Sequence, residues 1–173
     1  MNMYPSFSDI RNHLYHTFFT LRTSARRELL WAKLLGRSTK LAAFPEEAPE
    51  KSPNRQFIGT EDILVEQIIG TLNRHGDFDH KFRPLNKHLL ERWVNVHLSL
   101  DRDGWPPILV HKVGENYYVE DGHHRVSIAH ALGMKYIPAK VWDYPCQEQE
   151  TQPCQPEPCP EISTVTAYAG MAD

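Results

Sequence analysis

The segment from Tyr117 to Ala129 constrains the fold of this 173-residue chain more than any other. Its aromatic and β-branched start favours a strand, because such side chains pack well on a pleated surface. Gly122 follows, and glycine adopts backbone conformations that a residue with a Cβ resists. Apolar residues then recur at helical spacing: Val126, Ala129 and Leu132. The pattern predicts a strand, a glycine corner and a helix that ends at Gly133, with Asp121 as the N-cap.

The expected corner carries the groups of an anion site. A helix N-terminus entered through glycine presents unpaired N–H groups and a partial positive charge, which suit a phosphate or carboxylate. His123 and His124 add hydrogen-bonding groups and could exchange protons near neutral pH. Arg125 can hold an anion with a bidentate fork. Strand–glycine–helix corners are common, so spacing alone also allows the histidines to be incidental.

The string Asp-Gly-His-His-Arg at 121–125 and the segment 133–139 after the helix resemble the ParB/sulfiredoxin superfamily. The string is similar in particular to the ParB-like domains of free serine kinases and of uncharacterised bacterial proteins. The resemblance covers roughly residues 57–144. It implies an α+β (α/β) fold in which helices pack on a small mixed β-sheet, here preceded by a long amphipathic helix.

The same comparison of motifs separates the activities known on this fold. Sulfiredoxins carry a catalytic cysteine where this chain has His123, and no cysteine occurs between residues 57 and 144. Partition ParB proteins carry a Gly-Glu-Arg-Arg box, of which only Gly122 and Arg125 match. The residues after Trp142 show no helical period for a DNA-binding domain. We therefore expect neither a sulfiredoxin nor a full partition ParB, and no sequence-specific DNA binding.

The resemblance to serine kinases implies that the protein binds a nucleotide (ATP, ADP or CTP), for which Mg²⁺ is a candidate counter-ion. It also implies phosphoryl transfer to a small hydroxyl substrate. Gly122, His123 and His124 would hold a phosphate, with Arg125 neutralising its charge. Asp121 would orient a histidine or the substrate hydroxyl, and His123 or His124 would donate a hydrogen bond to a phosphate oxygen. The alternative is a non-catalytic nucleotide-sensing or DNA-associated regulatory module.

A polar loop at residues 73–79 supplies the acidic candidates. Asp77 and Asp79 could act as a general base, hold Mg²⁺, or form a helix-capping turn, and Arg74 could join the anion site. The resemblance implies a catalytic acidic residue in this region. The local family pattern is not reproduced here, so the choice between the two aspartates stays open, and no metal ligand is assigned.

Residues 9–36 form an expected amphipathic helix with seven apolar residues at spacings of mostly three and four: Leu14, Phe18, Leu21, Ala25, Leu29, Leu30 and Leu34. Residues 1–40 hold seven Lys/Arg and two Asp/Glu, a charge of +5, whereas the remainder holds twelve and twenty, a charge of −8. We expect the apolar face to pack on the domain, on a second copy or on a partner protein. A membrane-surface or nucleic-acid role is the weaker alternative.

The other elements follow from the spacing of apolar residues and from the positions of glycine and proline. Residues 1–43 form the expected N-terminal unit, 44–56 a proline-bearing linker, and 57–144 the folded domain. We expect strands at 63–65, 108–113, 116–120 and 136–142. A helix capped by Asn86 should place four residues in the core: Leu89, Trp93, Val96 and Leu100.

Composition adds the remaining expectations. The sequence shows no signal peptide and no run of apolar residues of membrane-spanning length, which predicts a cytoplasmic protein without a membrane span. Residues 145–173 are rich in Pro, Gln and Glu, which predicts disorder. The three cysteines lie in this segment, at Cys146, Cys154 and Cys159, and their odd number argues against a disulfide framework.

Overall fold

The computed structural model describes residues 6–45 and 55–144. Their helices are α1 (Phe7–Leu34), α2 (Leu90–Asp103) and α3 (His123–Leu132). Their strands are β1 (Ala42–Ala43), β2 (Gln56–Leu64), β3 (Ile68–Thr71), β4 (Ile108–Val113), β5 (Asn116–Asp121) and β6 (Tyr136–Tyr144). The segment 145–173 and most of the expected linker lie outside the described residues.

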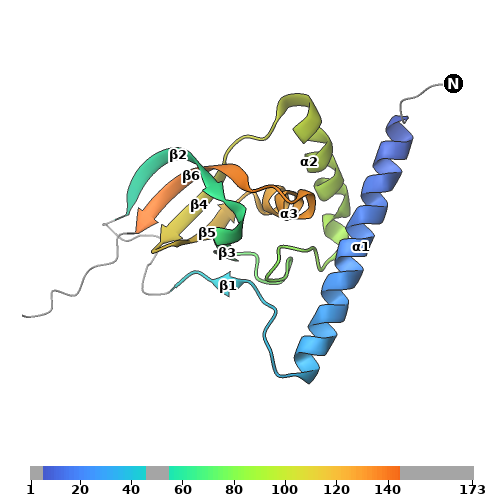
Figure 1. Ribbon diagram of the computed structural model, residues 1–173, viewed down its shortest axis with the longest axis horizontal. Helices are drawn as coiled ribbons and strands as arrows, with labels where there is room; N and C mark the ends of the chain where they lie inside the picture. The colour runs from blue at the N-terminus through green and yellow to red at the C-terminus, as the bar shows by residue number, and fades with distance from the viewer. Residues whose placement is uncertain (1–5, 46–54, 145–173) are drawn as a thin grey trace, which may run out of the picture.

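The six strands form one mixed sheet in the order β1-β3-β5-β4-β6-β2. Neighbours are parallel at β1–β3, β3–β5 and β4–β6, and antiparallel at β5–β4 and β6–β2. Helix α3 lies beside the sheet, α2 packs on α3, and α1 packs on the outer side of α2 (Figure 1). This arrangement confirms the expected fold class, a mixed sheet with packed helices and a long N-terminal helix.

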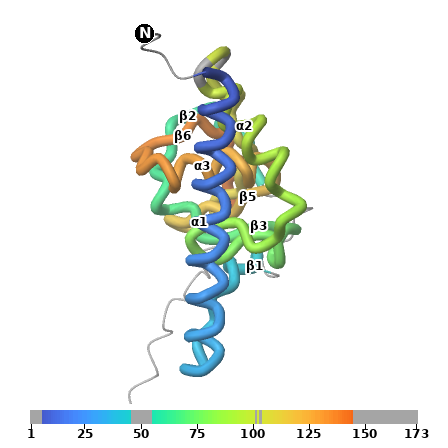
Figure 2. The backbone as a smooth tube through the Cα atoms, turned by 90° about the vertical axis from the view of Figure 1, so that its right-hand side faces the viewer, coloured from blue at the N-terminus to red at the C-terminus, as the bar shows by residue number. Residues whose placement is uncertain are grey.

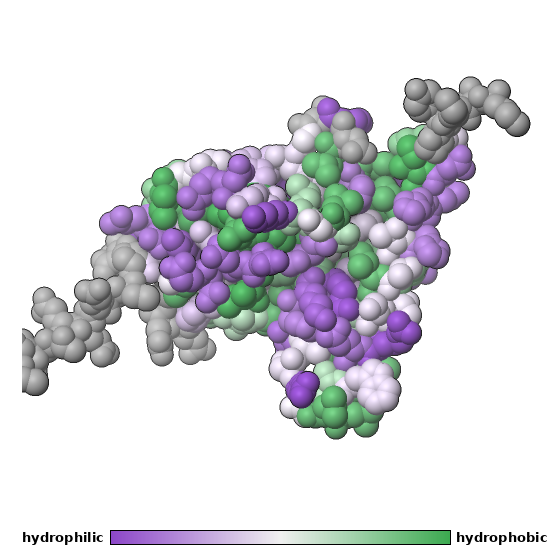
Figure 3. All heavy atoms as spheres, in the orientation of Figure 1, coloured by the Kyte–Doolittle hydropathy of each residue, from purple (hydrophilic) through white to green (hydrophobic). Residues whose placement is uncertain are grey.

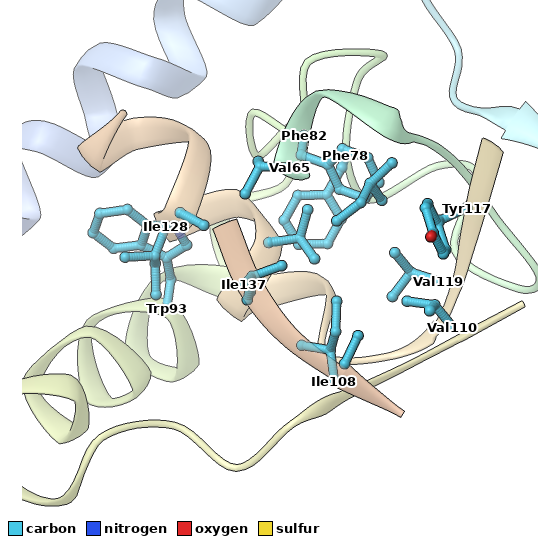
Figure 4. Close-up of a cluster of buried hydrophobic side chains, with 14 of the residues drawn as sticks. Val65, Phe78, Phe82, Trp93, Ile108, Val110, Tyr117, Val119, Ile128 and Ile137 are labelled. Carbon is cyan, nitrogen blue, oxygen red and sulfur yellow. The ribbon is translucent and has the colours of Figure 1, made fainter. Parts of the chain in front are cut away.

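The core lies between the sheet and the helices α2 and α3. Figure 4 shows Trp93, Ile128 and Ile137 pointing into one cluster that continues through Ile108 to Val119. Ile137, Ala139 and Val141 alternate inward along β6, as expected. The hairpin expected at Gly114 joins β4 and β5, and Gly114 has the positive φ (60°) that a tight turn requires.

Helix α1 begins with a capping box, in which the Ser6 hydroxyl accepts from the Asp9 N–H and the Asp9 carboxylate accepts from the Ser6 N–H. Leu14 and Phe18 are buried, and the Phe18 ring meets the edge of Trp93 at 5.8 Å between centroids. The apolar face therefore packs on the domain in this half of the helix.

The second half of α1 differs from the prediction. Leu29, Leu30 and Leu34 were expected to continue the buried stripe, but they are 41%, 64% and 78% exposed. This end of the helix extends past the rest of the fold (Figure 2), and the buried side chains in this half are the small ones of Ala25 and Ala32, at 1% and 7% exposure. Of the three apolar residues at helical spacing in α3, Val126 and Ala129 are buried and Leu132, in the last turn, is 48% exposed.

Two boundaries in the domain were also wrong. The sheet starts before residue 57, because β1 pairs with β3 and β2 begins at Gln56. Asn86 does not cap α2: a 3-10 turn, Lys87–Leu89, comes first, and the Asn86 amide donates to the Gly76 carbonyl (3.0 Å) and to Asp77 Oδ1 (3.1 Å). The Asn86 side chain thus holds the loop after β3 in place.

Within the described residues, no helix is both long enough and apolar enough to span a bilayer.

Two adjacent phenylalanines test how α1 is held. Phe18→Ala should lower the free energy of unfolding by about 3–5 kcal/mol, because it leaves a cavity against Trp93. Phe19→Ala is the matched control: its side chain is 38% exposed, and the loss should stay below about 1 kcal/mol. Urea denaturation measures both. Equal losses would contradict the packing of α1 on α2.

Candidate functional site

The corner between β5 and α3 is built around one glycine. Gly122 has φ of 104°, and a Cβ there would lie 2.5 Å from Ile108 Cγ2. Gly122 is itself the N-cap of α3, which corrects the expected capping role of Asp121. The Asp121 carboxylate makes no cap bond to the helix amides and accepts from Arg125 Nη2 at 2.6 Å.

The first turn of α3 is left without a side-chain cap. Its first backbone bond runs from the Val126 N–H to the Gly122 carbonyl at 3.0 Å. The preceding amides belong to the group that every helix leaves unpaired at its start. They form the positive end of the helix dipole and suit an outside anion.

A hollow of about 50 Å³ opens at this turn. Eight residues line it: Arg74, Arg92, Val96, Asp121, Gly122, His123, His124 and Arg125. Three guanidinium groups and one carboxylate give it a net positive charge. Sites that enclose a whole drug-sized ligand measure about 300–1,000 Å³, so this hollow suits a single phosphate-sized group.

The hollow lies where two parallel strands end side by side. β3 ends at Thr71 and β5 at Asp121, and the chain beyond each strand contributes residues: Arg74 after β3, and the start of α3 after β5. Helix α2 supplies Arg92 and Val96, which sequence reasoning missed as site residues. The available signal was their spacing of four, which puts both on one face of that helix.

Thr71, also not foreseen, fixes the ring of His123. The buried Thr71 Oγ1 accepts from the Asn73 N–H (3.3 Å) and the Arg74 N–H (3.1 Å), and it lies 2.6 Å from His123 Nε2. Two accepted bonds occupy both lone pairs of the hydroxyl, so its proton points at Nε2. The carbonyl of Val119, at 3.4 Å, is the more distant acceptor. This assigns the ring proton of His123 to Nδ1.

Both histidines are neutral at pH 7. Burial, followed by the positive charge of Arg74 and by that of His124 when it is protonated, lowers the pKa of His123 to about 4. Burial, followed by Arg92 and Arg74, lowers the pKa of His124 to about 4. The expected exchange of protons near neutral pH is therefore wrong for the unliganded site. His124 Nε2 is buried and has no hydrogen-bond partner among the described residues.

Arg125 is tied into the chain, which corrects the expectation of a guanidinium free to face an anion. Its Nη1 donates to the carbonyls of Pro106 and Pro107, the latter at 3.0 Å, and its Nη2 donates to Asp121. The side chain thus holds the entry to β4 against the corner while still lining the hollow.

The two loop aspartates are not equivalent. Asp79 is 1% exposed; its Oδ1 accepts from the backbone of Lys81 and Arg83, and its Oδ2 from Arg83 Nε at 2.8 Å. Arg83 in turn pairs with Glu28 of α1, so Asp79 joins the loop to that helix. It does not line the hollow, and the structure gives it a structural role in place of the expected catalytic one.

Asp77 lies closer to the site without lining it. Its Oδ2 accepts from Arg74 Nη1 (2.9 Å) and its Oδ1 from Asn86 (3.1 Å). Its negative charge acts on the pKa of both histidines in the direction opposite to burial.

No three His, Cys, Asp or Glu side chains meet as a metal site in the part of the chain described. These residues do not fit a protein-built Mg²⁺ site.

No protein-family model and no curated protein matches the chain. Among solved structures, it is similar to sulfiredoxin from Arabidopsis thaliana, with 24% identity and a TM-score of 0.36 over 47% of this chain and 82% of that one. It is also similar to a conserved hypothetical protein from Pyrococcus furiosus, with 20% identity and a TM-score of 0.37 over 53% and 35%. These scores carry no inference about function, and the superfamily resemblance of residues 121–125 stays a prediction.

The two lowered histidine pKa values predict how stability depends on pH. Between pH 6.5 and 4 the unfolded chain binds protons that the folded site does not, so the free energy of unfolding falls as the pH drops. The full loss is about 3 kcal/mol per histidine. Urea denaturation across this range should show a flatter dependence in a His123→Gln/His124→Gln variant. Equal slopes would contradict the buried neutral pair.

Proposed function

We propose that the hollow binds one phosphate group of a nucleotide such as ATP, ADP or CTP. The observation that carries the proposal is the Arg92 side chain, which lines the hollow and makes no hydrogen bond or ion pair with any described residue. An unpaired guanidinium can form charge-assisted hydrogen bonds to a phosphate, and an uncapped helix start offers N–H donors to the same group.

The other lining groups have separate roles in this proposal. Arg74 is partly exposed and shares its charge between Asp77 and the hollow. The N–H groups at the start of α3 donate to phosphate oxygens. His123 lines the hollow and, with its Nε2 held by Thr71, keeps Nδ1–H as the donor of its ring. Arg125 holds the corner in shape and adds charge.

The size of the hollow limits what it can recognise. About 50 Å³ encloses one phosphate, so the sugar and the base of a nucleotide would lie outside. We therefore expect the site to favour the number and charge of phosphates over the identity of the base. ATP and CTP should bind with similar affinity.

The step of phosphoryl transfer has weaker support than binding. The expected base, Asp77, has one oxygen held by Arg74 and the other by Asn86, and Asp79 is buried under Arg83. Transfer to a small hydroxyl substrate stays a hypothesis, and so does a regulatory role without catalysis. Mg²⁺ would have to enter together with the nucleotide.

The binding proposal predicts that Arg92→Ala lowers affinity for ATP by about ten- to a hundredfold, because it removes a charge-assisted contact worth roughly 1.5–3 kcal/mol. Lys87→Ala is the matched control, an exposed cation just before α2 that does not line the hollow. Arg125→Ala should weaken binding and also lower stability, since it releases Asp121 and two carbonyls. Isothermal titration calorimetry with ATP, ADP and CTP measures the affinities.

If Arg92→Ala binds ATP with undiminished affinity, and circular dichroism shows that its fold is intact, the proposal is wrong. Asp77→Asn separates binding from transfer in the same set of samples. If the protein only binds, this variant should change affinity little and there is no turnover to lose. A loss of turnover much larger than the loss of affinity would instead assign Asp77 to a catalytic step.

A further inference from the structure

Four large apolar side chains are mostly exposed at the C-terminal end of α1 and its C-cap. Leu30, Trp31, Leu34 and Leu35 are 64%, 66%, 78% and 64% exposed. Figure 2 shows this end of the helix extending past the rest of the fold, and Figure 3 shows apolar surface gathered at its end. We call these four residues the α1 tip.

The tip is not explained by the packing of α1 on the domain. That packing buries Leu14, Phe18, Ala25 and Ala32, and Glu28 pairs with Arg83, whereas the four tip side chains stay exposed. Scattered exposed leucines are ordinary, but a contiguous group at a projecting end marks a surface that binds something.

The charged residues around the α1 tip indicate what kind of partner it binds. Four cations surround it: Arg26, Arg27, Lys33 and Arg37. All four are exposed, and none of their side chains makes a hydrogen bond or ion pair with the described residues. An apolar group that contains a tryptophan and is ringed by unpaired cations combines insertion into an acyl layer with attraction to negative head groups.

We propose that the α1 tip inserts into the head-group region of an anionic membrane. A second copy fits less well, because two tips would bring two sets of four cations together. The charge of the described residues agrees with this orientation: residues 6–45 hold seven Lys/Arg and two Asp/Glu, a charge of +5, and residues 55–144 hold eleven and twelve, a charge of −1, so an anionic surface attracts the tip end more than the rest. The phosphate hollow has no part in this interaction.

Vesicle co-sedimentation with the full chain tests the proposal. The protein should bind vesicles of equal parts phosphatidylcholine and phosphatidylserine, should not bind pure phosphatidylcholine vesicles, and should release in high salt. Arg26→Gln/Arg27→Gln should weaken binding about fivefold per cation removed. Leu34→Gln/Leu35→Gln should weaken it at least about tenfold.

Two matched variants serve as controls. Phe7→Gln removes an equally exposed apolar residue (65%) at the other end of α1, and Lys87→Gln removes an exposed cation on the domain. Both should bind as the wild type does. No binding to the mixed vesicles, or binding that the tip variants leave unchanged, would overturn the proposal. So would a dimer in sedimentation velocity that Leu34→Gln/Leu35→Gln abolishes, because the tip would then be an interface between copies.

Discussion

The close approach of Gly122 to Ile108 is the constraint on which the site depends. With φ of 104° and no room for a Cβ, Gly122 lets β5 end and α3 start within one residue. The first turn of α3 therefore opens directly above the carboxyl ends of β3 and β5. Arg125 then fixes the corner from the other side, through Asp121 and two proline carbonyls. The hollow is a consequence of this backbone path.

The electrostatics of the hollow follow from what surrounds it. Two histidines buried beside arginines stay neutral, so the positive charge comes from guanidinium groups and the helix end. An incoming phosphate would bring negative charge close to the rings and favour their protonated forms. Thr71 keeps the ring of His123 in place meanwhile, because its hydroxyl is itself anchored by two loop amides. Binding and protonation of the pair are thus expected to be linked.

Local sequence signals predicted those parts of the fold that depend on local chemistry. The hairpin at Gly114, the corner at Gly122 and the end of α3 at Gly133 follow from glycine in turns and caps. Competition between alternative hydrogen-bond partners could not be predicted. Asn86 and Asp121 are residue types typical of helix caps, but Asn86 donates to Asp77 in the loop after β3, and Asp121 accepts from Arg125. The site's α2 residues and Thr71 were missed because α2, β3 and α3 meet only in the tertiary fold. The helical spacing of apolar residues predicted α1. It could not show which of those residues lie beyond the domain on which the helix packs.

The most direct test of the central claim is the chemical shift of the backbone amides at the start of α3 during an ATP titration followed by ¹⁵N–¹H NMR. Hydrogen bonds to phosphate oxygens should move the amide protons of His123, His124 and Arg125 downfield, and inorganic phosphate should move the same signals. The amides of the α1 tip should stay unchanged. If ATP shifts signals elsewhere and leaves these three in place, the hollow is not the nucleotide site and the account is wrong.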